Sequence, residues 1–562
     1  MPLTPAEQLA AYLMAPEKVP RPALGSLPDE ETLRAFVEEH KLPLEEVIAV
    51  NGLEDDPVVQ AEPVRRVLAW DRERHRKFRD EFAAFRERLD ALGIRHCLIK
   101  AVHFAPYRSE NVDILIPLDA IGQAEVKLID MGHIRNRYYR DRYKLLYDRI
   151  AESRVDGMIH VHKNVSWYAA FIEPERVFES AVPGAEAGLV MPSAEVALAI
   201  TACHALYEEA SVKCIEHHKV LCLLRRGVDW GRLWELAEHR GFGSGLALVL
   251  LILDRQHRTY VGEPLFEPAR LEAMRIRLSR LDGSLGHYRR RVAGRELRSP
   301  HVVSKYFARR MLFCELWRSR IITFGTKVSL TARILRDGFK QVTGWRPKPP
   351  TVVAVCGPDG SGKTTQVEHL ATILDGFELE PVCSWIRIGD SPILNRLKGP
   401  FRRRLRAEAE VGQVSEQGVF KSRLLRCLWP PIAVADYLLR QYAALLWAFV
   451  RGRVVIADRY HIDALVDLAM RCGPEVLGRR WLRMVMGLLP KARPAFVLQV
   501  PQETLRRRRS DDYIEGISDR QLGYYRKASE LMGGVAVPAE RSPDDVAEEM
   551  AREVLRRFYR RV

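Results

Sequence analysis

A glycine-rich stretch between an apolar run and a helical pattern carries the clearest chemistry in the chain. Residues 357–364 read G-x-x-x-x-G-K-T and follow the run TVVAV at 351–355. Glycines allow backbone N–H groups to curve around a phosphate, and the next helix points its positive N-terminal end at the anion. The residues expected to bind nucleotide phosphates are Gly357, Asp359, Gly360, Ser361, Gly362, Lys363, Thr364 and Thr365.

Four side chains in this region have distinct expected roles. Lys363 is placed to reach the β- and γ-phosphates, and the Thr364 hydroxyl is placed to ligate magnesium. Asp458 closes the apolar run RVVIAD, so at the carboxyl end of a parallel strand it would lie beside the loop and support the metal. Arg459 follows and is expected to contact an acceptor phosphate. The alternative is an Asp–Arg pair that only caps a strand-to-helix turn. The expected cofactors are ATP and Mg²⁺.

The elements that must position these groups follow Pro350. Five apolar runs, several rich in β-branched residues, alternate with long helical stretches, at 351–357, 381–389, 453–460, 495–500 and 533–539. Such alternation is typical of a parallel sheet covered by helices on both faces. We therefore predict an α/β fold with a five-stranded parallel sheet. A capping box of Ser542 and Asp545 is expected to begin the last helix.

Three segments together resemble the thymidylate kinase family of nucleoside-monophosphate kinases. They are GPDGSGKTT at 357–365, RGRVVIADRY at 451–460 and PAFVLQVPQETLRRRRSDD at 494–512. The resemblance spans about 348–562 and implies a P-loop kinase that transfers the γ-phosphoryl group of ATP. It also implies an arginine-bearing lid. Arg506 and Arg509 are the expected lid residues because they are three apart and share a helix face, the alternative being a solvated basic helix.

The acceptor side departs from the family pattern. WIRIGDSP at 385–392 supplies Arg387 but lacks the Glu–Pro that follows in the family, and Tyr437 stands where the family has an arginine. The resemblance therefore implies ATP as donor and an acceptor other than dTMP. Arg387, Arg459 and Tyr460 are the expected acceptor-binding residues. The expected catalytic residues are Lys363, Asp458, Arg459, Arg506 and Arg509.

A second resemblance covers about 76–250. LGIRHCLIKAVHFAPYRSENVDILIPLD at 92–119 resembles the nucleotidyltransferase superfamily, which holds two magnesium ions with an Asp-x-Asp pair. Asn111 replaces the first acid of the pair, Asp113 keeps the second, and His160 and His162 stand where a third acid is expected. Three interpretations stay open. The region is a substrate-holding domain without catalysis, a working transferase with altered ligands, or unrelated to that fold.

The chain divides by pattern into four regions. They are a helical region at 1–75, an α+β nucleotidyltransferase-like domain with a helical extension at 76–260, a basic helical linker at 261–347, and the kinase-like domain at 348–562. The net charge of +15 over 562 residues favours anionic partners. The nine cysteines include no C-x-x-C pair, which favours reduced, buried thiols and gives no prediction of zinc.

We predict an ATP-dependent phosphotransferase whose partners are ATP and an anionic or phosphorylated acceptor, either a small molecule or a peptide. No signal-peptide or membrane-spanning pattern is visible, so a cytoplasmic protein is expected. One alternative is a nucleotide-gated regulatory protein that contacts nucleic acid or membrane through the basic segment 261–345. Another is an active nucleotidyltransferase.

Overall fold

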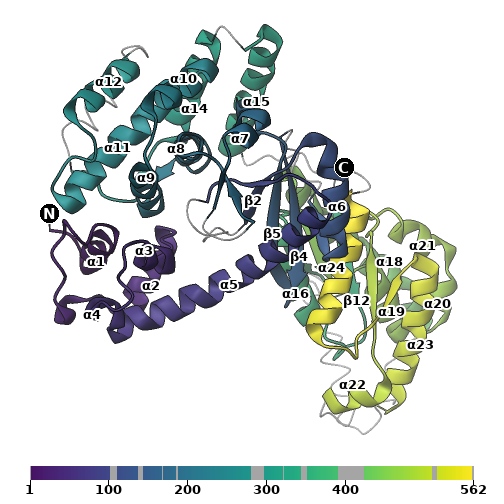
Figure 1. The fold of residues 1–562 in the computed structure, drawn as a ribbon. Coiled ribbons are helices and arrows are strands. Elements are labelled where there is room, and N and C mark those ends of the chain that lie inside the picture. The colour runs from purple at the N-terminus through teal and green to yellow at the C-terminus, as the bar shows by residue number, and fades with distance from the viewer. Residues whose placement is uncertain are drawn as a thin grey trace. The chain divides into compact units, whose positions relative to one another are not determined.

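The chain forms two compact units, one of Met1–Asp148 with Gly157–Phe339 and one of Arg149–Asp156 with Lys340–Val562. A ribbon of the computed structural model is drawn in Figure 1. The structure describes residues 2–101, 111–136, 143–167, 169–184, 188–279, 296–319, 322–343, 351–389, 423–508 and 515–559.

The first unit begins with five helices around a small apolar core. They are α1 (Pro5–Met14), α2 (Glu30–Glu39), α3 (Leu44–Val50), α4 (Pro57–Gln60) and α5 (Glu62–Ala91). Leu9, Val37 and Val47 are fully buried in this core. Helix α5 runs unbroken for 30 residues, so the predicted boundary at residue 75 falls inside one helix and is wrong.

A mixed sheet follows, in the strand order β1-β2-β5-β4-β3. Its elements are β1 (Cys97–Leu98), β2 (Val112–Leu115), α6 (Ile121–Asp130), β3 (His133–Arg135), β4 (Lys144–Ala151) and β5 (Arg154–His162). Strand β2 is antiparallel to β1 and parallel to β5. Phe82 and Phe85 from the second half of α5 share a buried core with Val112 and Ile114 of the sheet, so α5 packs against it.

Short hairpins and a helical bundle complete the first unit. The hairpins are β6 (Val165–Trp167) with β7 (Ala169–Ile172), and β8 (Val182–Pro183) with β9 (Val190–Met191). Helix α7 (Pro174–Glu179) lies between the two hairpins in the sequence. The bundle contains α8 (Ala194–Cys203), β10 (Ser211–Val212), α9 (Cys214–Arg226), α10 (Trp230–Arg240), α11 (Gly243–Val261), α12 (Pro268–Ser279), β11 (His301–Val302), α14 (Lys305–Arg318) and α15 (Phe324–Thr343). Met311 and Leu312 of α14 are buried in the bundle core, so the predicted linker at 261–347 supplies part of the core instead.

The second unit contains a five-stranded sheet in the order β13-β14-β12-β15-β16, with every described neighbour pair parallel. The strands are β12 (Thr351–Cys356), β13 (Val382–Trp385), β14 (Val454–Asp458), β15 (Ala495–Gln499) and β16 (Val535–Pro538). This confirms the predicted parallel sheet. All six residues of the central strand β12 are buried, as expected for a strand with helices on both faces.

The helices of the second unit connect these strands. They are α16 (Lys363–Gly376), α18 (Arg423–Val450), α19 (His461–Cys472), α20 (Glu475–Gly478), α21 (Arg480–Met486), α22 (Gln502–Arg508), α23 (Glu515–Met532) and α24 (Pro543–Tyr559). The backbone N–H of Asp545 donates to Ser542 Oγ at 3.2 Å, which confirms the predicted start of the last helix. Within the described part of the chain, no helix has the length and apolar character needed to cross a membrane.

Candidate active site

The glycine-rich loop connects the end of β12 to the start of α16. Gly360 and Gly362 have φ angles of +89° and +90°, in the left-handed region that favours glycine. Gly362 is the residue that precedes the first turn of α16, so the unpaired N–H groups of that turn face the loop. The loop therefore presents a concentration of backbone donors at the positive end of a helix, which suits a bound phosphate.

Lys363 is the first residue of α16, directly after this loop, and is only 6% exposed. Its Nζ donates to the carbonyl oxygens of Gly357 and Pro358, each at 2.8 Å, and lies 3.5 Å from Asp359 Oδ1. Burial lowers the pKa of the ammonium group. The backbone thus holds this cation at the position where a phosphate bound by the loop would meet it.

Thr364 and Asp458 bring a hydroxyl and a carboxylate together beside the loop. Thr364 Oγ1 donates to Asp458 Oδ2 at 3.0 Å. The pairing of parallel β12 and β14 sets Asp458 opposite Val355, one residue before the end of β12. The other oxygen, Asp458 Oδ1, is buried and has no hydrogen-bond partner among the described residues. Hard oxygen ligands, one of them without a partner, fit the requirements of Mg²⁺.

Arg459 turns back toward the loop. Its backbone has a φ of +79°, and its Nη2 donates to Asp359 Oδ1. Burial alone would raise the pKa of Asp359, but the positive charges of Lys363 and Arg459 outweigh it and lower that pKa. Asp359 therefore stays ionised and holds the Arg459 guanidinium over the loop.

These groups surround a polar pocket of about 260 Å³. It is lined by Asp359, Gly360, Gly362, Lys363, Thr364, Thr365, Trp385, Asp458 and Arg459. The structure thus brings together most of the predicted phosphate-binding residues. Gly357 and Ser361 do not line the pocket, and Ser361 is 2% exposed. Trp385 was not predicted. It is opposite Asp458 in the strand pairing and 58% exposed. The signal available in the sequence was an aromatic residue inside the apolar run 381–389.

The predicted acceptor-binding residues are placed differently. Arg387 donates from Nε to Asp467 Oδ2 at 3.1 Å and is not part of the pocket lining. Tyr460 is 1% exposed, and its hydroxyl donates to the carbonyl of Pro490 at 2.9 Å. Its side chain packs in the core and does not line the pocket, so the structure gives no support to the predicted contact of Tyr460 with substrate. Tyr437, at the departure from the family pattern, is also fully buried.

The predicted lid arginines fall largely outside the described residues. Arg509 lies outside the described residues, and the side chain of Arg506 is not described. Arg508 is described, and its Nη1 would lie 4.0 Å from a Cβ placed on Gly362. The arginine of this run that approaches the loop among the described side chains is therefore Arg508, which the prediction passed over.

A buried carboxylate that contacts the loop was not predicted from the sequence. Asp463, in the first turn of α19, is 1% exposed. It accepts from Gly357 N at 3.3 Å, Tyr460 N at 3.1 Å and the Tyr525 hydroxyl at 2.7 Å. Burial raises its pKa. The signal in the sequence was an acidic residue three positions after Tyr460, the spacing of a helix cap.

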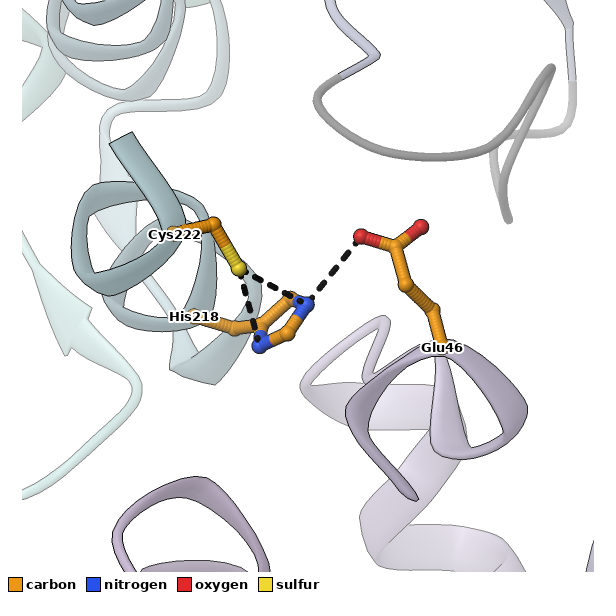
Figure 2. Close-up of side chains that lie close together, drawn as sticks. All are labelled: Glu46, His218 and Cys222. Atoms are coloured by element: carbon orange, nitrogen blue, oxygen red, sulfur yellow. Dashed lines mark hydrogen bonds and ion pairs between the residues drawn. The ribbon is translucent and has the colours of Figure 1, made fainter. Parts of the chain in front are cut away.

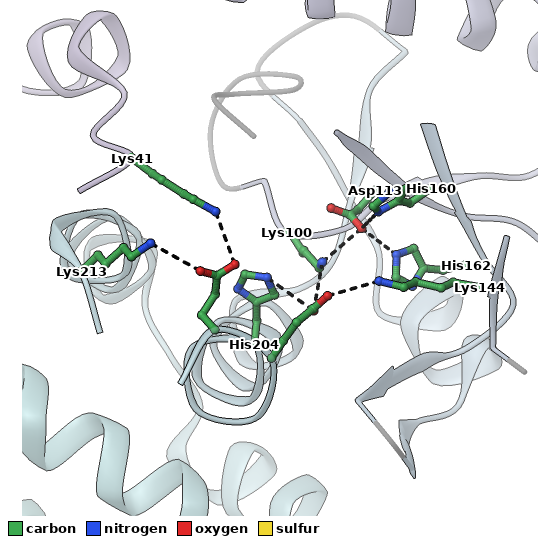
Figure 3. Close-up of polar contacts among 10 residues, drawn as sticks. Lys41, Lys100, Asp113, Lys144, His160, His162, His204 and Lys213 are labelled. Carbon is green, nitrogen blue, oxygen red and sulfur yellow. Dashed lines mark hydrogen bonds and ion pairs between the residues drawn. The ribbon is translucent and has the colours of Figure 1, made fainter. Parts of the chain in front are cut away.

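In the first unit, Asp113 is the centre of a buried polar cluster (Figure 3). Its Oδ1 lies 2.7 Å from His162 Nε2, 3.4 Å from His160 Nδ1 and 3.1 Å from Lys100 Nζ. The parallel pairing of β2 and β5 produces this arrangement, because it sets Asp113 opposite His160. The predicted neighbours of Asp113 are therefore brought together.

The charges of this cluster do not fit a two-magnesium site. Lys100 also contacts Glu208 Oε2 at 3.5 Å, and Lys144 contacts Glu208 Oε1 at 3.2 Å, so two ammonium groups pair with two carboxylates (Figure 3). Burial lowers the pKa of His160 to about 4, which leaves its ring neutral. A dication at Asp113 would meet the Lys100 ammonium, and like charges at this distance repel strongly in a buried site. The Lys100 ammonium already provides the positive charge next to Asp113.

Glu208 and Glu209 were not predicted as site residues. They lie in a π-helical turn, His204–Glu209, directly after α8. Glu209 pairs with Lys41 at 3.3 Å and Lys213 at 3.4 Å on the opposite side of the turn. The signal was an acidic pair at the end of an otherwise apolar helical pattern.

Neither a scan of protein-family models nor a search of curated proteins gives a match for this chain. The two family resemblances therefore stay predictions that rest on short motifs.

Proposed function

We propose that the second unit is a magnesium-dependent phosphotransferase that uses ATP as donor. The observation that carries the proposal is the contact of the Thr364 hydroxyl with Asp458 at 3.0 Å, beside the buried ammonium of Lys363. A hydroxyl and carboxylate for magnesium, a lysine for phosphate and a helix N-terminus are the parts that phosphoryl transfer requires. The left-handed glycines of the loop support the same assignment.

Each group has a role in that reaction. Magnesium–ATP supplies the phosphoryl group and part of the charge neutralisation. Thr364 and Asp458 would hold the metal, and the N–H groups at the start of α16 would bind phosphate oxygens. Lys363 and Arg459 place positive charge where negative charge develops during transfer, and fixed charges of this kind supply much of the rate enhancement.

The acceptor is proposed to be an anionic or phosphorylated small molecule or peptide other than dTMP. Arg387 pairs with Asp467, and Tyr437 and Tyr460 are buried, so the residues at these positions are occupied by internal contacts. Trp385 instead exposes its ring at the pocket. An exposed ring beside a cationic pocket suits an acceptor that has both a flat or apolar part and an anionic group.

The first unit is proposed to hold or select the substrate without nucleotidyl transfer. The ion pair of Lys100 with Asp113 at 3.1 Å supports this, because the lysine stands where a catalytic metal would be needed. Incubation of the full chain with α-labelled nucleotides and the same acceptors tests it. Label that moves onto an acceptor, and no longer does so in Asp113→Ala, would show that the unit is a working transferase.

The kinase proposal is tested with purified full-length chain, γ-labelled ATP, magnesium and a panel of acceptors. Lys363→Ala should lower transfer at least about 100-fold, because electrostatic stabilisation dominates this chemistry. Lys491→Ala is the matched control, since Lys491 is an exposed lysine of the same unit that does not line the pocket. Equal transfer by the wild type and Lys363→Ala would contradict the proposal. ATP binding without transfer to any acceptor would favour the regulatory alternative.

A further inference from the structure

Three potential metal ligands converge in the first unit, far from the phosphate loop in the sequence. Glu46 of α3 and His218 and Cys222 of α9 point toward one another (Figure 2). Glu46 Oε1 lies 3.1 Å from His218 Nε2, and Cys222 Sγ lies 3.6 Å from the same nitrogen. The three ligand atoms all lie within 4.8 Å of one another.

Local structure explains why these side chains meet. His218 and Cys222 are four residues apart on one helix, so they project from the same face. On α3, Glu45 pairs with Arg72 and Arg79, while the adjacent Glu46 turns inward and is 3% exposed. Glu46 Oε2 is buried and has no hydrogen-bond partner in the part of the chain that the structure describes. The cluster therefore has an unused ligand oxygen.

The cluster does not have the arrangement of a thiol–imidazole–carboxylate catalytic triad. In a triad the nucleophile and the acid contact different nitrogens of the ring. Here both the carboxylate and the thiol approach Nε2. The relative exposures of Glu46, His218 and Cys222 are 3%, 1% and 2%, so a substrate would not reach the sulfur.

The distances and donor types suit zinc. Zinc bonds of about 2.3 Å to sulfur and about 2.0–2.2 Å to nitrogen and oxygen give tetrahedral edges of about 3.5 Å for S···N and about 3.4 Å for N···O. The observed 3.6 and 3.1 Å are close to these edges. The combination of thiolate, imidazole and carboxylate is one that zinc accepts. One thiolate and one carboxylate also balance the charge of the dication, which limits the cost of burying it.

We propose that Glu46, His218 and Cys222 form a zinc-binding site that fastens the N-terminal helices to α9. Cys222 Sγ also lies 3.9 Å from Nδ1, beside the ring, so ligation requires a rotation of the His218 ring or the Cys222 side chain. Three protein ligands leave the fourth tetrahedral position for a water molecule. Ligands that are 172 residues apart explain why the spacing of cysteines in the sequence predicted no zinc.

The Asp113 cluster, which has two histidines and a carboxylate, differs from the Glu46 cluster in one respect. Lys100 lies 3.1 Å from the Asp113 oxygen that both histidines approach. In the Glu46 cluster the third group is the sulfur of Cys222, which lies 3.6 Å from His218 Nε2 and gains a negative charge when it binds zinc. Zinc is therefore proposed at Glu46 and not at Asp113.

Cobalt is the probe for this site, because a cobalt–thiolate bond gives a charge-transfer absorption band that oxygen and nitrogen ligands do not give. Untagged full-length chain is stripped with a chelator, returned to metal-free buffer and titrated with Co²⁺. We expect one cobalt per chain with the thiolate band, displacement by one equivalent of Zn²⁺, and zinc in the protein as first purified.

Two variants and a control decide the result. Cys222→Ser should lose the band, whereas Cys214→Ser should keep it, because Cys214 is a buried cysteine of the same helix outside the cluster. Glu46→Gln keeps the side-chain size and decides the matter if Cys222→Ser does not fold. It should weaken cobalt binding at least about 100-fold, since even loss of an outer partner costs about 10–100-fold. A wild type without the band, or a band that persists in Cys222→Ser, would overturn the proposal.

Discussion

The chemistry proposed for the candidate active site depends on the charges of a few individual side chains. Lys363 lies among backbone carbonyls, Asp359 holds Arg459, and Asp458 has one buried oxygen without a partner among the described residues. Burial makes each charge more effective because the local dielectric is low. The loop is therefore a region where small chemical changes should have large effects on function.

Asp458→Asn is the sharpest test of the magnesium assignment. The amide keeps the shape of the side chain but removes the negative charge that a hard dication requires. We expect phosphoryl transfer to fall at least about 100-fold and the magnesium concentration needed for half-maximal activity to rise. Asp375→Asn, an exposed change on α16, should leave both unchanged. An unaltered magnesium dependence in Asp458→Asn would refute the assignment.

At the scale of elements, the contacts that hold the loop are as informative as the loop itself. Asp463 connects Gly357, at the start of the loop, to Tyr460 at the start of α19 and to Tyr525 on α23. The position of the loop after β12 thus depends on contacts with α19 and α23.

Asp463→Asn should show this dependence. The amide NH₂ would face a backbone N–H that now donates to a carboxylate oxygen, and an unmet buried donor costs about 1–3 kcal/mol. We expect a lower melting temperature and a higher KM for ATP. Tyr525→Phe removes one of the three bonds and should cost only about 1 kcal/mol. Wild-type stability and KM in Asp463→Asn would show that the contact does not position the loop.

Helix α14 carries a buried acid that should make stability depend on pH. Glu315 accepts from Ser244 N at 2.7 Å and the Tyr207 hydroxyl at 3.1 Å, and burial raises its pKa to about 7. Because the folded state binds this proton more tightly than the unfolded state, the contribution of Glu315 to stability falls as pH rises from about 4.5 to 7. The full loss is roughly 3 kcal/mol. Denaturant unfolding at pH 5 and pH 8 should show Glu315→Gln to be less pH-sensitive than wild type, and equal sensitivity would contradict this.

Several elements could be predicted from the sequence, and others could not. The parallel strands were visible because β-branched runs such as 351–355 are short, apolar and separated by helical patterns. The phosphate loop was visible because its residues are contiguous. The clusters around Glu46, Asp463 and Glu208 were not, because tertiary packing assembles them from side chains that are ordinary in local sequence. Helix α14 was mistaken for part of a linker because its arginines mask a buried face.

At the scale of the whole molecule, the division into two units predicts two separable responses. Magnesium–ATP at 100 times its Kd should raise the free energy of unfolding of the second unit by about 2.7 kcal/mol. The thermal transition of that unit should therefore move to a higher temperature, and the other transition should stay in place. Removal of zinc should lower the transition of the first unit. Calorimetric scans of the full chain test both effects. A shift of both transitions by ATP, or one that persists in Lys363→Ala, would show that the units do not respond as assigned.

The most direct test of the central claim is equilibrium dialysis of labelled ATP with the full-length chain in the presence of magnesium. The wild type should bind one ATP per chain, and Lys491→Ala should bind it equally. Lys363→Ala should bind it about 10- to 100-fold more weakly, because a hydrogen bond to a charged group contributes about 1.5–3 kcal/mol. Absence of ATP binding by the wild type, or equal binding by Lys363→Ala, would contradict a phosphate site at this loop.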